Sequence, residues 1–437
     1  MKIPHFIKGN LLLKITSLNS GVIVVRLLVA FFIQRELTDI VGKGGYAKIG
    51  SLRNLLAQLT SLTSLGIFNG VVKYVAEYKE DKEQLQRLFS TAFVFTITGS
   101  LIAFLILFFG AERLSVYYFT SAEYTYIIKL LAVVVPFISI QRVFNGVVNG
   151  LSKYKSFAKI ELIAYLLIAA TTLSLLYYDN LDGALMAIAI SPMIQVVVLL
   201  YIFIKVLRDY VQFSKLQFKV PMAKSLLAFT FMSFVSTVLL NQIEIEIRNF
   251  ITDKVSLDDA GIWTGMTTLS KNYMVFSGAI FSLYVIPKFA SIKTERGFKK
   301  ELLFIYKTLL PIFALGMLVI YLCRGLFIKY VFIDFDEMAP LFKWQLLGDF
   351  VRLASVVLAH QFLAKKMVKS FIFSEILSLL LFYLFANYLV DIYGVEGVVI
   401  GHFLRYIIYF VVVFFLVIRY FRKEKRRKQT ELDNDIP

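Results

Sequence analysis

The sequence predicts an all-α polytopic membrane protein, with twelve transmembrane helices in two six-helix lobes around a central cavity. Apolar residues make up 58% of the 437 residues and charged residues only 18%, whereas soluble domains carry about 25% charge. The apolar runs reach about 20 residues, enough to span a bilayer as a helix. They do not alternate with the period of two that a membrane β-barrel requires.

Twelve stretches satisfy the length criterion for a membrane-spanning helix. The first follows Met1–Asn10 directly, so we expect no cleavable signal peptide. In chain order, the expected spans cover residues 11–32, 49–72, 88–109, 124–150, 157–177, 183–204, 225–250, 259–286, 302–323, 340–364, 370–390 and 394–418.

Basic residues alternate between successive connecting segments. One set of segments, which includes both ends of the chain, holds 29 Lys and Arg residues, whereas the alternate set holds only 7. Basic connections face the cytoplasm, so both termini are expected there. The formal net charge of +17 is therefore mainly a topology signal, and we expect no nucleic-acid partner. We interpret the basic run from Arg419 to Lys428 as a plain stop-transfer signal; binding of anionic lipid head groups or of a partner is the alternative.

The longest polar cytoplasmic connection lies near the middle of the chain, with six expected spans on either side. Both halves place a glycine-containing second span before a basic cytoplasmic connection, which is a weak internal repeat. Parallel repeats of this kind occur in transporters that move two lobes about a central site. We therefore expect an N-terminal lobe over 1–210, a connector over 211–224, a C-terminal lobe over 225–418 and a basic tail over 419–437.

Several classes of site are excluded by residue usage. The one cysteine, Cys323, leaves no internal disulfide and no cysteine metal cluster, and three histidines offer little for a metal site. No GxxxxGK[ST] phosphate-binding loop is present. The motif Lys43-Gly-Gly-Tyr46 is interpreted as a turn between the first two spans. We expect no metal, no cofactor and no catalytic residue.

Charged side chains within the spans are the strongest functional signal. Each basic side chain costs about 2.5–3.5 kcal/mol at the bilayer centre, so seven would cost on the order of 20 kcal/mol if all faced lipid. They must instead line a hydrated cavity or pair with acids. The seven deep basic residues are Arg26, Arg53, Arg142, Arg248, Lys271, Arg352 and Arg405.

Polar residues recur at helical spacing beside these basic residues. In the tenth span, Gln345, Asp349 and Arg352 stand at i, i+4 and i+7 and share one face. In the twelfth, His402 and Arg405 share a face in the same way. Such stripes on several apolar helices predict an internal aqueous chamber.

Five acids lie within the spans: Glu161, Glu244, Glu246, Asp349 and Glu375. Glu244 with Arg248, and Asp349 with Arg352, have the spacing of local ion pairs, so a purely structural role stays open for both pairs. Basic residues still outnumber acids. A net positive chamber favours an anionic substrate, and the planar arginine fork suits phosphate oxygens.

Four blocks of the sequence resemble the Wzx-type flippases of lipid-linked oligosaccharides, which include O-antigen and lipid III flippases of the multidrug/oligosaccharidyl-lipid/polysaccharide exporter superfamily. They are LGIFNGVVKYVAEY at 65–78, GIWTGMTTLSKNYMVFSGAIFSLYVIPKF at 261–289, LFKWQLLGDFVR at 341–352 and FIFSEI at 371–376. The resemblance implies two six-helix lobes, as in multidrug exporters of this superfamily, that work by alternating access in the bacterial inner membrane.

The resemblance also implies a cargo and roles for particular residues. The cargo would be an undecaprenyl-pyrophosphate-linked oligosaccharide, moved from the cytoplasmic to the periplasmic leaflet, with an O-antigen polymerase and a chain-length regulator as partners. Arg26 and Arg53 match cationic positions of the family's cavity. Asp349 and Glu375 match its acids, to which we assign gating or coupling, while Lys271 has no counterpart there and depends on local arguments alone.

Three alternatives remain to be weighed. A multidrug antiporter of the same superfamily would favour an acidic or apolar cavity, which the seven basic residues oppose. A lipid II flippase needs a cationic chamber too, but such proteins commonly have two further spans. An enzyme acting on the same carrier would show a metal-binding acidic motif on the cytoplasmic side, whereas Asp334-Phe-Asp336-Glu lies in an expected outer connection.

Overall fold

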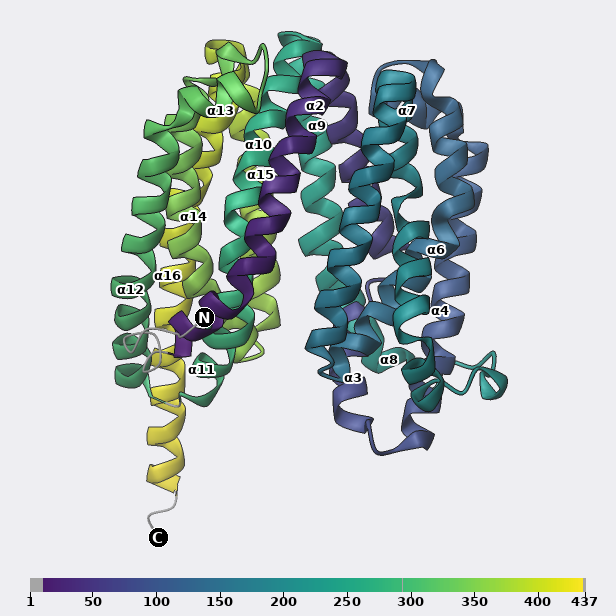
Figure 1. The fold of residues 1–437 in the computed structure, drawn as a ribbon. Helices are drawn as coiled ribbons and strands as arrows, with labels where there is room; N and C mark the ends of the chain where they lie inside the picture. The colour runs from purple at the N-terminus through teal and green to yellow at the C-terminus, as the bar shows by residue number, and fades with distance from the viewer. Residues whose placement is uncertain (1–10, 293, 435–437) are drawn as a thin grey trace. The chain divides into compact units, whose positions relative to one another are not determined.

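The computed structural model describes residues 11–292 and 294–434. Helices form nearly all of this part, and it contains no strand (Figure 1). In chain order they are α2 (Leu11–Leu62), α3 (Phe68–Tyr78), α4 (Lys82–Phe109), α5 (Ala111–Phe119), η1 (Ala122–Tyr124), α6 (Thr125–Gly150), α7 (Tyr154–Tyr210), η2 (Phe213–Lys215), α8 (Ala223–Ser233), η3 (Phe234–Leu239), α9 (Leu240–Lys254), α10 (Leu257–Ile280), η4 (Phe281–Val285), α11 (Ile286–Ser291), α12 (Glu295–Leu322), α13 (Arg324–Tyr330), η5 (Asp336–Met338), α14 (Leu341–Ala364), α15 (Val368–Tyr393) and α16 (Val395–Asn434). The predicted all-α class is confirmed.

Eight helical stretches of the described chain are long and apolar enough to cross a membrane. One of them, 156–210, contains both the fifth and the sixth predicted spans. The protein is therefore a multi-pass membrane protein. The count of twelve spans stays a prediction.

The chain forms two compact units. The first comprises residues 28–248, and the second comprises 249–437 together with 1–27. Each unit has its own apolar core: Phe89 and Phe203 belong to the core of the first, and Phe362 and Tyr409 to that of the second. These boundaries differ from those of the lobes expected at 1–210 and 225–418, whose six-and-six division stays a prediction.

Two of the helices contain breaks where connections were expected. In α2 the backbone leaves helical geometry at Gly42, with φ of 64° and ψ of −174°. Residues 43–46 are helical, so the turn expected at Lys43–Tyr46 lies one residue earlier, at a glycine that tolerates positive φ. In α7 the break falls at Asp179 and Asn180, within the expected connection at 178–183.

The second predicted span, 49–72, is interrupted, and to that extent the prediction was wrong. Helix α2 ends at Leu62 and α3 begins at Phe68, with positive φ at Leu65 and Gly66 between them. A Cβ on Gly66 would lie 2.8 Å from Ser233 Cβ on α8. The hydropathy of the sequence does not indicate this turn, because the residues around it are apolar.

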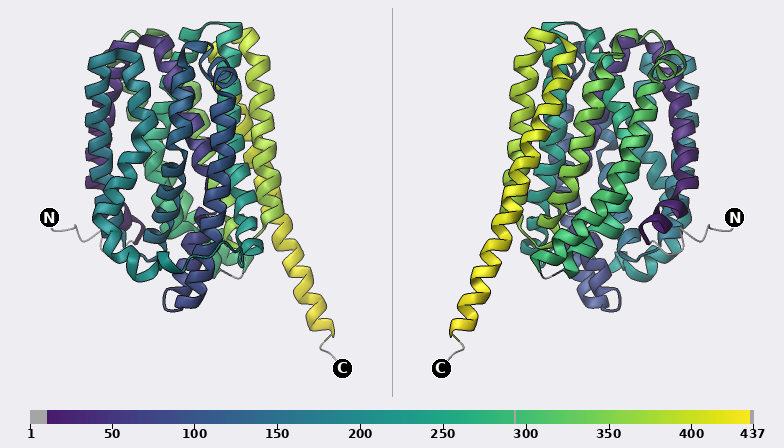
Figure 2. Two further views of the ribbon diagram at one scale, coloured as in Figure 1. Left: turned by 90° about the vertical axis from the view of Figure 1, so that its right-hand side faces the viewer. Right: turned by 90° about the vertical axis from the view of Figure 1, so that its left-hand side faces the viewer.

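Two stretches of wide helical turns interrupt the seventh and eighth spans. Residues Phe234–Leu239 and Phe281–Val285 are π-helical, each continuous with α-helix on both sides. At the other end of the chain, α16 runs through the basic tail to Asn434 and continues past the ends of the neighbouring α14 and α15 (Figure 2).

Candidate functional site

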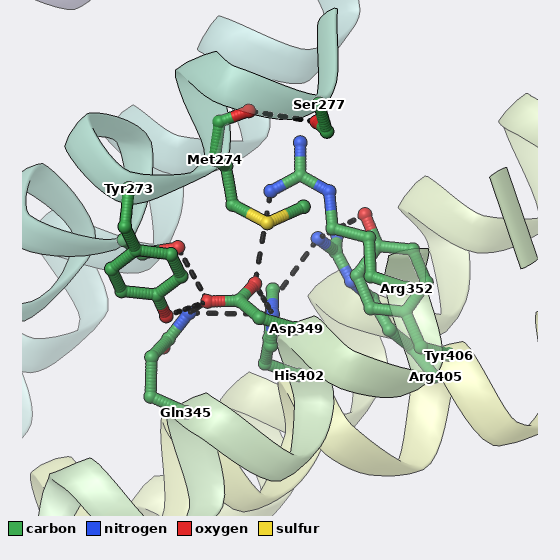
Figure 3. A network of polar contacts seen from close by, with 10 residues as sticks. Tyr273, Met274, Ser277, Gln345, Asp349, Arg352, His402, Arg405 and Tyr406 are labelled. Atoms are coloured by element: carbon green, nitrogen blue, oxygen red, sulfur yellow. Dashed lines mark hydrogen bonds and ion pairs between the residues drawn. The ribbon is translucent and has the colours of Figure 1, made fainter. Parts of the chain in front are cut away.

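A buried carboxylate lies at the centre of the most connected polar cluster in the second unit (Figure 3). Asp349 on α14 has no exposed surface. Its Oδ2 accepts hydrogen bonds from Ser270 Oγ at 2.5 Å, from Gln345 Nε2 at 3.0 Å and from the Tyr273 hydroxyl. Helices α10 and α14 therefore supply three donors to one oxygen, which stabilises the ionised form of this carboxylate within an apolar bundle.

The second oxygen of Asp349 faces two groups that carry or accept protons. His402 Nε2 on α16 lies 3.1 Å from Oδ1, and Arg352 Nη1 lies 3.8 Å from it. The local Asp349–Arg352 pair expected from the i, i+3 spacing is therefore present. Of Asp349, His402 and Arg352, the arginine is the partly exposed one, with 32% of its side-chain surface accessible.

Close approach of α14 and α16 depends on a glycine. A Cβ placed on Gly348 would lie 2.5 Å from His402 Cδ2 and 3.2 Å from Phe403 Cα. Any larger residue would therefore push α16 outward and move the imidazole away from Asp349. Gly348 directly precedes Asp349 in the sequence.

The ring of His402 links Asp349 to a second buried arginine. Arg405 Nη2 lies 3.3 Å from His402 Nδ1 and donates to the Tyr406 hydroxyl at 3.2 Å. Because a guanidinium only donates, Nδ1 must accept, and the proton of a neutral ring therefore sits on Nε2 and points at Asp349. The Arg405 guanidinium also lies 3.9 Å from the ring centroid of Phe382, and the residue is only 4% exposed.

The other predicted gating acid, Glu375, lies on α15. Its Oε1 accepts a hydrogen bond of 2.7 Å from the Tyr409 hydroxyl on α16. Helix α16 thus contacts both acids, Asp349 through His402 and Glu375 through Tyr409. One rigid element connects the two carboxylates.

In the first unit, an amide joins the predicted pair Glu244 and Arg248. Asn54 Nδ2 donates to Glu244 Oε2 at 2.6 Å, while Arg248 Nη2 donates to Asn54 Oδ1 at 3.1 Å. Arg248 Nη1 also lies 3.3 Å from Ser51 Oγ. Asn54 and Arg248 are 3% and 4% exposed, so α2 and α9 share a buried polar layer.

The other two predicted cavity residues of this unit, Arg53 and Arg142, contact aromatic side chains. Arg53 Nη1 donates to the Tyr46 hydroxyl at 3.2 Å, and that hydroxyl donates in turn to Gln34. The Arg142 guanidinium lies 3.8 Å from the ring centroid of Phe68. Such stacking stabilises a cation without neutralising it, which leaves both residues suited to an anionic ligand.

A tyrosine on the short helix α5 completes a polar layer that the sequence did not reveal. Tyr117 donates to Glu246 Oε1 and accepts from Gln242 Nε2 at 2.5 Å. Beside it, burial raises the pKa of Tyr118 to about 12, so its hydroxyl stays protonated and donates to Gln58 Oε1 at 3.2 Å. Helix α5 lies in a segment expected to be a plain outer connection, and its spacing carries no signal for these partners.

The structure does not bring all seven predicted cationic residues into one described cluster. Arg352 and Arg405 join the Asp349 cluster, whereas Arg53, Arg142 and Arg248 have separate surroundings in the first unit. Arg26 is half-buried on α2, and Lys271 is exposed on α10, next to Ser270. Within the described residues, no group of three His, Cys, Asp or Glu side chains is placed to hold a metal ion.

Sequence comparison assigns the chain to a family. Residues 12–293 match the family described as polysaccharide biosynthesis protein. The chain belongs to this family. The lipid III flippase of Escherichia coli (strain K12) is 28% identical over 400 residues, which cover 91% of this chain and 93% of that protein.

Solved structures show the same fold at lower sequence identity. An inward-facing multidrug resistance MATE family transporter of the MOP superfamily is similar with a TM-score of 0.71 and 15% identity, over 91% of this chain and 96% of that one. The lipid II flippase MurJ in its inward closed conformation gives a TM-score of 0.68 and 15% identity, over 92% and 87%. The predicted MOP/MATE-like fold is confirmed.

Proposed function

We propose that the protein is a flippase for an undecaprenyl-pyrophosphate-linked oligosaccharide, the repeat unit of an O-antigen or related surface polysaccharide. It moves this lipid from the cytoplasmic to the periplasmic leaflet of the inner membrane by alternating access, with both termini cytoplasmic. An O-antigen polymerase and a chain-length regulator are the expected partners. The match to a lipid III flippase over nine-tenths of both chains supports a lipid-linked glycan as cargo.

The observation that carries this proposal is the retention of buried arginines within apolar helices. Arg248 and Arg405 are each 4% exposed, in spans where a cation is costly unless it is paired or serves a ligand. Arg53 and Arg142 lie on aromatic rings and keep their charge available. A pyrophosphate brings the complementary negative charge, and its glycan needs the polar groups that surround these arginines.

Coupling is assigned to the Asp349 cluster and Glu375. In the conformation described, Asp349 holds Arg352 and, through His402, is linked to Arg405. A shift of α16 against α14 within this unit would break the His402 contact and free positive charge for the pyrophosphate. With the cell interior negative, outward movement of an anion gains about 2.3 kcal/mol per charge per 100 mV.

Two other cargoes have structural relatives but less support. The multidrug transporter and the lipid II flippase share the fold at 15% identity. A drug antiporter selects cations, which the buried arginines disfavour. No residue of the described chain specifically supports lipid II as the cargo.

Complementation of a flippase-null strain tests the proposal. We expect the wild-type chain to restore surface polysaccharide and to clear the accumulated lipid-linked precursor. Arg53→Ala, at matched membrane expression, is expected to fail, and Arg53→Lys to restore part of the function because the charge is kept. Drug resistance without restored polysaccharide would assign the protein to the multidrug exporters instead, and full function of Arg53→Ala would remove Arg53 from the site.

A further inference from the structure

An apolar groove lies between α12 and α14 in the second unit, away from the Asp349 cluster. Its volume is about 460 Å³, and Met317, Leu318 and Tyr321 of α12 line one side of it. From α14, Leu347 and Phe350 contribute to the other side. Leu318 and Leu347 are 52% and 42% exposed. Within two membrane-spanning helices, such a groove opens toward hydrocarbon.

One end of the groove is cationic. Among the described residues that line it, Lys343, the third residue of α14, is the one that carries a charge. It is exposed, its Nζ lies 4.8 Å from the Trp344 ring centroid, and within the described residues no carboxylate lies within 4.0 Å of it. A second cation stands at the same end, because Arg324 donates to the Tyr321 carbonyl at 2.9 Å and lies 4.4 Å from that ring.

The groove has the polarity gradient of a bilayer lipid. Lys343 and Phe350 are seven residues apart, so the groove runs roughly 10 Å along α14 from its end toward the middle of the bilayer. Because the chain joins α12 to α14 through α13 and η5, the end of α12 with Tyr321 lies beside the start of α14 with Lys343. Both cations therefore lie at a depth where phosphate groups reside, and the apolar walls lie where acyl chains reside.

We propose that this groove binds an anionic glycerophospholipid, with its phosphate at Lys343 and one acyl chain along Met317, Leu347 and Phe350. Lys343 and Arg324 both lie at this end of the groove, and no described carboxylate lies within 4.0 Å of Lys343. This excess of positive charge favours a lipid head group with a net negative charge over a zwitterionic one. With the orientation proposed above, the site lies in the outer leaflet. The inference does not depend on the identity of the transported cargo.

The site has a route to the Asp349 cluster. Lys343, Leu347 and Phe350 lie on one face of α14, while Gln345, Asp349 and Arg352 lie on the other. A bound chain packs against the helix that positions Asp349. Occupancy of the groove is thus expected to stabilise the arrangement of α14.

Native mass spectrometry of the full chain, purified in detergent and stripped of lipid, tests this inference. The probes are dioleoylphosphatidylglycerol, dioleoylphosphatidylethanolamine and a polyisoprenyl monophosphate. We expect the phosphatidylglycerol to bind most tightly. Lys343→Gln should weaken it about fivefold, the effect of one basic residue near a membrane surface, while Lys307→Gln on the same helix pair should leave it unchanged.

A second variant tests the apolar part of the groove. Ala314→Trp places an indole in the groove, because Ala314 lines it, and should weaken phosphatidylglycerol binding at least about tenfold through loss of chain contacts. Leu315→Trp, at a neighbouring exposed position outside the lining, is the matched control. Any of three results would overturn the proposal. They are equal phosphatidylglycerol binding by Lys343→Gln and the wild type, equal phosphatidylglycerol binding by Ala314→Trp and Leu315→Trp, and tighter binding of the polyisoprenyl phosphate than of phosphatidylglycerol.

Discussion

His402 Nε2 lies 3.1 Å from Asp349 Oδ1, and both residues are almost completely buried between α14 and α16. The contact joins the tenth and twelfth predicted spans through an imidazole whose other nitrogen faces Arg405. Asp349 therefore contacts the ring of His402 and, through this ring, is linked to Arg405. The first prediction tests this carboxylate directly.

Asp349→Asn keeps the shape of the side chain and removes its charge. We expect loss of complementation, because Arg352 and Arg405 lose the acid that holds them in the conformation described. The free energy of unfolding should fall by about 1–3 kcal/mol, the cost of leaving buried donors poorly satisfied. Surface polysaccharide and the thermal unfolding midpoint in detergent are the measurements. Normal transport by this variant would remove Asp349 from the gate.

Gly348→Ala should destabilise the second unit. The added Cβ meets His402 Cδ2 at 2.5 Å and the backbone at Phe403, so α14 and α16 must separate at a cost of about 1–3 kcal/mol. Gly316→Ala on α12 is the control, because nothing lies within 4 Å of its Cβ. That substitution should be neutral or should stabilise by up to about 1 kcal/mol. Equal unfolding midpoints for the two variants would contradict the packing described here.

A double-mutant cycle can measure how strongly Asn54 is coupled to Glu244. We expect Asn54→Ala and Glu244→Ala each to destabilise, with an interaction term of about 0.5–3 kcal/mol, because either substitution removes the same hydrogen bond. A cycle of Asn54→Ala with Tyr178→Phe, at a highly exposed position of α7, should be additive. The check is the unfolding free energy of all variants in one detergent. Additivity of the first cycle would contradict a stabilising hydrogen bond between Asn54 and Glu244.

Tyr117→Phe removes a hydroxyl that both donates and accepts. Glu246 and Gln242 would each lose a partner, so we expect destabilisation of about 1–3 kcal/mol and reduced transport. Tyr178→Phe, at a highly exposed position of α7, should change neither. A Tyr117→Phe variant that matches Tyr178→Phe in midpoint and in polysaccharide would show that α5 plays no part in the polar layer.

The sequence predicted the fold class well because apolar length and loop charge are one-dimensional signals that the bilayer imposes. It also placed Gln345, Asp349 and Arg352 on one helical face, since their spacing alone decides that. The partners of Asp349 on other helices, Ser270 and Tyr273, have no such signal, because helix packing determines which spans meet.

The interruption at Leu65 and Gly66 was missed for a related reason. Its cause is close packing against Ser233, far along the chain, and the local residues remain apolar. Likewise, no local pattern predicts that Asn54 joins Glu244 to Arg248. Hydropathy and periodicity describe single helices, whereas these features arise between helices.

The wide turns at Phe234–Leu239 have a consequence for how this span tolerates insertions and deletions. A π-helical turn holds one residue more than an α-helical path would need. Deleting one residue there would restore a regular α-helix and leave α9, with Asn241 and Arg248, in phase with its neighbours. Deletion of Phe350 or Val351 would instead rotate the rest of α14 by about 100° and turn Arg352 away from Asp349. Length variation among relatives should therefore concentrate at the wide turns.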